Sequence, residues 1–130
     1  MEPGFAVGHY NIGLLLQQQG QDSESPGYLL AAMELDPEYC LPLVTLGDIA
    51  MNSADFESAI GNYSAAYRLS PKHNRVKEVP RSLAKLGMQM ARGGEYKNAA
   101  AFLEIAYELK PPKVREIMDF SFKMMNLYEQ

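Results

Sequence analysis

Positively charged side chains are absent from the first half of this sequence. No Lys or Arg occurs between Met1 and Tyr67, where nine Asp and Glu give a charge of −9. All twelve bases lie between Arg68 and Gln130, where seven acids leave a charge of +5. A chain folded in sequence order would therefore have an acidic first half and a basic second half, and an acidic partner should prefer the second.

Cysteines and long apolar runs are also scarce. Cys40 is the only cysteine, which excludes an internal disulfide framework. No run of 18 apolar residues occurs, so we expect no membrane span, and no basic segment followed by an apolar one marks a secretory signal. We therefore expect a cytoplasmic location. A chain of 130 residues that is 47% hydrophobic suits a single domain, residues 1–130.

Residues that could support catalysis are few and scattered. His9 and His73 are the only histidines, and neither lies near an acid at metal-ligand spacing. We expect His9 and Cys40 to be core residues. There is no glycine-rich phosphate loop and no nucleophile beside a base. The sequence therefore predicts no enzyme, no cofactor, no bound metal and no small-molecule substrate.

The clearest pattern present is a pair of amphipathic helices between Leu43 and Pro71. Apolar residues recur there with a period near 3.6 on both sides of a polar break at 52–55. Gly47 and Ala59 fall on the inner faces, where small residues let two helix backbones approach closely. Pro71 should stop the second helix.

The same pattern occurs once before this helix pair and once after it. The positions that coincide in all three copies are Gly13, Gly47 and Gly87, Ala32, Ala66 and Ala106, and Pro37, Pro71 and Pro111. This resembles the tetratricopeptide repeat (TPR), which has small residues and a closing proline at these spacings. The resemblance implies an all-α, right-handed superhelix of about seven helices in antiparallel pairs, with a concave groove for a peptide or protein.

The repeats are expected at 6–39, 40–73 and 80–113, with a basic insert at 74–79 and a terminal helix at 114–128. Pro26 should delay the second helix of the first repeat to Ser23 or Ser25, and the next helix should begin at Leu41 or Pro42. The first helix is expected at 6–19. Pro3 matches the closing prolines in register, so we interpret Glu2-Pro3 as the end of a preceding unit in a longer natural chain.

The resemblance also locates a binding face on the first helix of each repeat. Its expected residues are Tyr10, Asn11, Leu14, Gln17, Val44, Thr45, Asp48, Met51, Arg81, Lys85, Met88 and Arg92. Met adapts to apolar ligand groups, and Arg or Lys one turn apart can hold a carboxylate. We therefore expect a protein or peptide partner with apolar and acidic groups, bound by a non-catalytic scaffold module.

One TPR subfamily binds chaperone tails through a clamp of Lys and Asn residues. Arg81 and Lys85 fit the basic positions of its third repeat. Tyr10, Leu14 and Thr45 stand where the clamp needs Lys, Asn and Asn, so we do not expect chaperone-tail binding.

Two alternatives stay open. The chain could self-assemble head to tail through its acidic and basic ends, or it could be a TPR appendage of an excised enzyme such as a transferase. Nucleic-acid binding is disfavoured by the acidic net charge of −4.

Overall fold

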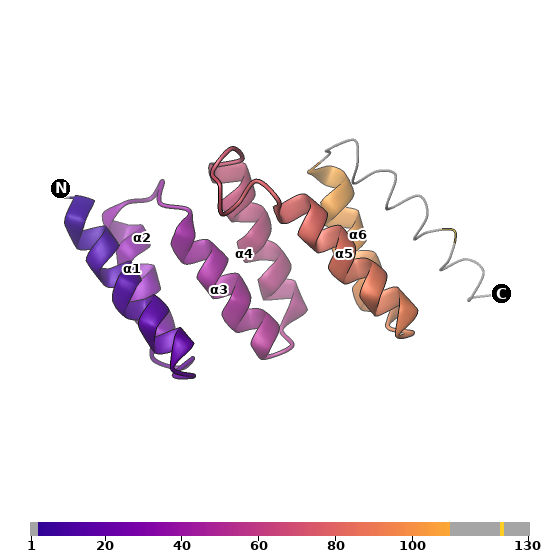
Figure 1. The fold of residues 1–130 in the computed structure, drawn as a ribbon, viewed down its shortest axis with the longest axis horizontal. Helices are drawn as coiled ribbons and strands as arrows, with labels where there is room; N and C mark the ends of the chain where they lie inside the picture. Colours follow the sequence, from indigo (N-terminus) through magenta and orange to yellow (C-terminus); the bar gives the residue numbers. More distant parts are fainter. Residues whose placement is uncertain (1–2, 110–122, 124–130) are drawn as a thin grey trace. The chain divides into compact units, whose positions relative to one another are not determined.

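A computed structural model describes residues 3–109 and 123, and these residues form six α-helices and no strand. Figure 1 shows the helices following one another in antiparallel pairs. The prediction of an all-α chain of paired helices is confirmed. The helices are α1 (Pro3–Gln18), α2 (Ser25–Leu35), α3 (Leu41–Asn52), α4 (Phe56–Leu69), α5 (Val79–Arg92) and α6 (Tyr96–Glu108).

The chain divides into two compact units, Met1–Val76 and Lys77–Gln130, which we describe separately. In the first unit α1 packs against α2, α3 packs against α4, and α3 also contacts both helices of the first pair. In the second unit α5 packs against α6. None of the helices described is both long and apolar enough to cross a membrane.

Local sequence determines where the helices begin and end. Pro26, Pro42 and Pro80 each lie in the first turn of a helix, where proline removes no helical hydrogen bond. Asp55 caps α4, because its side chain accepts a hydrogen bond from the Ser58 amide at 3.3 Å. Gly20, after α1, has a φ of +79°, the left-handed conformation that ends many helices.

Each repeated glycine faces a side chain of the adjoining helix. A Cβ added to Gly13 or Gly87 would stand 2.8 Å from the nearest side-chain atom of Leu29 or Leu103, respectively. A carbonyl oxygen of the adjoining helix lies at 3.3 Å in both pairs. At Gly47 the nearest atom belongs to the ring of Tyr63, at 2.6 Å. The prediction that these glycines permit close helix packing is confirmed.

Two expectations about helix bounds require correction. Helix α1 begins at Pro3 and therefore before the expected Ala6, because proline is tolerated in a first turn. Val79, assigned to the insert, belongs to α5, and Val76 within that polar connection is fully buried. Ile12 of α1 is exposed, although the equivalent Leu46 of α3 is half-buried against the core.

Other expected bounds agree with the structure: α2 begins at Ser25, and α3 begins at Leu41. The predicted terminal helix at 114–128 lies outside the described residues, apart from Lys123.

Candidate functional site

Four predicted binding residues lie on α1. Asn11 is exposed, and Leu14 and Gln17 are half-buried. Tyr10 is buried, with only 4% of its surface exposed. Its ring meets that of Tyr39 edge-on, with centroids 5.3 Å apart and planes at 63°. Tyr10 therefore belongs to the core in this structure, and its assignment to an open binding wall is corrected.

Tyr10 is part of the cluster that joins the first helix pair to α3. Leu29 and Ala32 of α2 complete the buried centre of this cluster. Five half-buried apolar side chains pack around it: Leu14, Tyr39, Leu41, Leu46 and Ile49. Burial raises the pKa of the Tyr39 hydroxyl, and the neighbouring Tyr10 adds to the effect. An aromatic residue at position 10 thus stabilises the stacking of α3.

The other first-unit residues of the predicted face lie on α3. Val44 and Met51 are half-buried and Asp48 is exposed. Thr45 is buried, and its hydroxyl donates to the Leu41 carbonyl at 3.4 Å, one turn back in the same helix. The assignment of Thr45 to the open binding face is therefore also corrected, because its side chain points into the protein.

Asp48 already has a partner within the protein. The Tyr63 hydroxyl donates a hydrogen bond to Asp48 Oδ1 at 2.5 Å, which joins α4 to α3. Burial, followed by this hydrogen bond and the Asp48 charge, raises the pKa of Tyr63 far above its usual range. Tyr63 therefore remains protonated and holds Asp48 in place, so this carboxylate is an exposed surface feature of fixed orientation.

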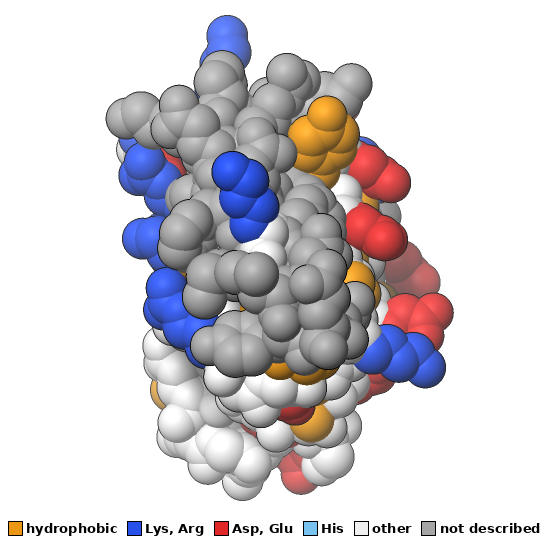
Figure 2. All heavy atoms as spheres, turned by 90° about the vertical axis from the view of Figure 1, so that its right-hand side faces the viewer, with side chains coloured by type: hydrophobic (Ala, Val, Ile, Leu, Met, Phe, Trp, Pro, Cys, Tyr) orange, Lys and Arg blue, Asp and Glu red, His pale blue; other side chains and the backbone are white. Residues whose placement is uncertain are grey.

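The second-unit residues of the predicted face form a stripe along α5. Arg81, Lys85, Met88 and Arg92 follow one another at intervals of four, three and four, which places them on one side of a helix. Lys85 and Arg92 are exposed, and Met88 is half-buried between them. Figure 2 shows Lys and Arg side chains following one another along one edge of the view. We call these four residues the α5 basic stripe.

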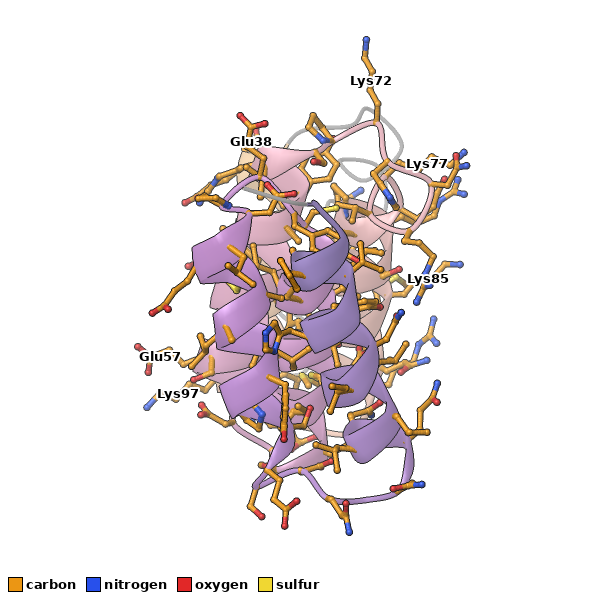
Figure 3. The ribbon with its side chains drawn as sticks, turned by 90° about the vertical axis from the view of Figure 1, so that its left-hand side faces the viewer. Glu38, Glu57, Lys72, Lys77, Lys85 and Lys97 are labelled. Atoms are coloured by element: carbon orange, nitrogen blue, oxygen red, sulfur yellow. The ribbon has the colours of Figure 1, made fainter. Side chains whose placement is uncertain are left out.

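Arg81 is held loosely at the beginning of the stripe. One of its guanidinium nitrogens, Nη1, lies 3.8 Å from Glu78 Oε2, with side-chain exposures of 42% and 60%. An exposed pair at this distance contributes little to stability, so a competing carboxylate can replace Glu78 at small cost. Lys77 lies on the same side of the unit as Lys85, and Lys97 of α6 projects to the opposite side (Figure 3).

The residues considered for chemistry lie apart from one another. Cys40 is buried and unpaired. His9 is half-buried, and its ring centroid lies 6.3 Å from that of Tyr28. Within residues 3–109 and at 123, no three His, Cys, Asp or Glu side chains come together as a metal site would require.

One polar contact in the core was missed by the sequence reasoning. Ser25 is fully buried, and its hydroxyl donates to the Gly13 carbonyl at 2.6 Å, across the α1–α2 contact. The repeat alignment could have indicated a small buried residue here, because Ser25 occupies the position of Ala59 and Ala99, which are both fully buried. Small size was therefore predictable, whereas the hydrogen bond was not.

No family model and no curated protein matches this sequence. Solved structures of SycD, a type III secretion translocator chaperone of Yersinia enterocolitica, match in fold. One, described as an alternative dimer, has a TM-score of 0.57 and 19% identity over 97% of this chain and 92% of SycD. A second has a TM-score of 0.55 and 20% identity, with coverages of 94% and 88%.

A third SycD structure contains a peptide of the translocator YopD. Its TM-score is 0.55 and its identity 20%, over 95% of this chain and 91% of SycD. At these identities the likeness concerns the fold alone. The chain therefore shares with SycD a fold of successive helix pairs.

Proposed function

We propose that this chain is a non-catalytic protein-binding module that holds a partner segment bearing acidic and apolar side chains. The α5 basic stripe is the observation that carries this proposal. It combines two exposed bases, one weakly paired Arg and a half-buried Met on one side of a helix. Carboxylates can pair with the bases, while the Met thioether adapts to an apolar neighbour.

The first unit contributes a second, chemically different surface. Asn11, Leu14, Gln17, Val44 and Met51 are exposed or half-buried and carry no charge. Such amide and aliphatic side chains suit a ligand segment that is less polar. The SycD structure with a YopD peptide supports the general idea, since that fold accommodates a peptide. The TPR family, the repeat bounds 6–39, 40–73 and 80–113, and a cytoplasmic location remain part of the proposal.

The two alternative functions differ in what they require of the stripe. Charge-driven head-to-tail assembly would use Lys85 and Arg92 against the acidic half of another copy. A scaffold appended to an enzyme would use them for a substrate protein or for the enzyme itself. In each case the bases of the stripe pair with carboxylates. The cases differ in whether those carboxylates belong to another copy of the chain, to a substrate protein or to the enzyme.

Selection from a displayed library of random peptides tests the proposal, because it lets the surface choose its own ligand. Selection on the full chain should enrich peptides that combine Asp or Glu with aliphatic residues. The Lys85→Glu variant should bind the selected peptides at least about tenfold more weakly, because one charge-assisted contact becomes a repulsion. Affinity should also fall as salt rises.

Lys97→Glu is the matched control, because it makes the same charge change on an exposed Lys on the other side of the unit. It should leave peptide affinity within about twofold, since Lys97 projects away from the stripe and salt screens an exposed charge. Equal losses in the two variants would show that net charge, and not the α5 basic stripe, governs binding. Selection of peptides without acidic residues would overturn the proposal.

A further inference from the structure

Asp48 is the only charged residue in the two helices that carry the expected binding face of the first unit. Helix α1 contains no Asp, Glu, Lys or Arg, and α3 contains Asp48 alone. The Asp48 side chain is exposed. A partner segment with only acidic and apolar side chains would give this carboxylate nothing to bind, so the function proposed above does not yet account for Asp48.

The Asp48 carboxylate is held in one orientation by Tyr63 of α4. The Tyr63 hydroxyl donates to Oδ1 at 2.5 Å, and its ring lies against Gly47, the residue before Asp48. Because burial and this bond raise the pKa of Tyr63, the proton stays on the hydroxyl and the negative charge stays on Asp48. The bond uses one of the roughly four lone-pair positions of a carboxylate. The others can accept from a ligand, and the group is already ordered before binding.

No base of the first unit neutralises Asp48. The segment from Met1 to Tyr67 contains no Lys or Arg, so the only bases of this unit are Arg68, Lys72 and Arg75, against nine acids. Within residues 3–109 and at 123, no Lys or Arg forms an ion pair with Asp48. The excess of acids gives the first unit a negative potential, which attracts a cation to an exposed carboxylate.

The surroundings of Asp48 suit the cation of a side chain better than a metal ion. Val44 and Met51 lie one turn before and one turn after Asp48 on the same side of α3, and both are half-buried. Lys and Arg can lay their aliphatic stems on such apolar groups while the charged end reaches a carboxylate. A metal ion requires several ligating groups, and no three His, Cys, Asp or Glu side chains come together in the described part of the chain.

We infer that Asp48 binds a basic side chain, Lys or Arg, of the partner segment, with Val44 and Met51 against the aliphatic stem of that side chain. This inference rests on the proposed function and extends it. The partner segment then carries a base for the first unit in addition to the acids that the α5 basic stripe binds. Tyr63 is a positioning residue, because it orients the carboxylate and does not itself pair with the ligand.

Peptides selected on the full chain, as described above, are the probe for this inference. They should carry Lys or Arg in addition to acidic and aliphatic residues. Asp48→Asn should weaken their binding about tenfold, because it removes the charge but keeps an oxygen that can accept from Tyr63. Replacement of the peptide's base by Met should cost about as much. The two changes together should cost little more than either alone, because each removes the same contact.

Tyr63→Phe separates orientation from charge. It keeps the Asp48 carboxylate and removes the hydroxyl that holds it, so it should weaken the selected peptides about threefold. It should not affect binding of the peptide in which Met replaces the base. Equal losses for the two peptides would show a general structural effect and would overturn the positioning role of Tyr63.

Glu57→Gln is the matched control, because it also converts an exposed carboxylate of the first unit into an amide. Glu57 lies six positions before Tyr63 and therefore on a different side of α4. The control should leave affinity within about twofold. Three results would each overturn the inference: selected peptides without a base, unchanged affinity of Asp48→Asn, or equal losses in Asp48→Asn and Glu57→Gln.

Failure of this inference can be told apart from failure of the proposed function. If Lys85→Glu weakens binding and Asp48→Asn does not, the inference is wrong and the proposed function stands. If the selected peptides lack acidic residues, the proposed function is wrong, and the inference that rests on it is wrong as well.

Discussion

The ring of Tyr63 fills the space beside Gly47, with its nearest atom 2.6 Å from where a Cβ would stand. Its hydroxyl continues past the glycine to Asp48 on the same helix. Leu29 and Leu103 occupy the equivalent space in the other two pairs, without a polar end. At this one contact the shared packing device of the fold also orients a surface carboxylate.

Substitution of Gly47 by Ala should destabilise the protein. The added methyl displaces a ring that is tethered by a hydrogen bond, which outweighs the gain in helix propensity and leaves a net loss of about 1–2 kcal/mol. Gly61→Ala makes the same change in α4, where no atom lies within 4 Å of the new Cβ. It should stabilise by about 0.5–1 kcal/mol. Urea unfolding of both variants checks the predicted opposite signs.

Removal of the Tyr63 hydroxyl should lower stability and alter its pH dependence. Tyr63→Phe keeps the ring beside Gly47 and loses the bond to Asp48, at a cost of about 1 kcal/mol near neutral pH. Because the folded pKa is raised, the wild-type contribution is complete below the unfolded pKa of about 10 and is lost as pH rises above it. The difference in unfolding free energy between the two proteins should therefore shrink above that pH. A constant difference up to strongly alkaline pH would contradict this assignment.

Ser25 should contribute through its hydrogen bond to Gly13. Ser25→Ala retains the packing volume found at Ala59 and Ala99 and should cost about 1 kcal/mol. Ser25→Leu should cost more, about 1–3 kcal/mol, because the site is fully buried and overpacked by the larger side chain. Ser23→Ala, in the exposed connection before α2, is the control and should change little. Thermal unfolding monitored by circular dichroism ranks the three variants.

The cap of α4 should be measurable on its own. Asp55→Ala removes the acceptor for the Ser58 amide and should cost about 1 kcal/mol of unfolding free energy. Asp55→Asn retains a capping oxygen and should stay close to wild type in the same urea titration. Equal losses in both variants would indicate that the charge of Asp55, and not its hydrogen bond, stabilises the helix.

Sequence periodicity was a good guide to the helices because the relevant interactions are local. Prolines fix first turns, and a glycine or an aspartate marks an end or a beginning through backbone geometry alone. The recurrent spacing of Gly13, Gly47 and Gly87 also located the contact within each pair, since helices joined by short connections pack as antiparallel neighbours. The repeat thereby predicted an all-α chain of paired helices.

Accessibility was the property that the repeat could not predict. Tyr10 and Ile12 are near neighbours on one helix, yet the first is buried beneath α3 and the second is exposed. Likewise, Thr45 points inward while Asp48 points outward and binds Tyr63. A helical period places residues on a stripe, but which stripe is covered depends on the neighbouring element, which the period does not contain.

By itself, the sequence determined the number and approximate bounds of the described helices, the position of each close glycine contact and the separation of acidic from basic segments. Only the tertiary structure decided which side chains of the expected binding face are open and which, like Tyr10 and Thr45, are buried. The physical reason is that helix formation and capping are local, whereas burial is a property of surfaces brought together from distant parts of the chain.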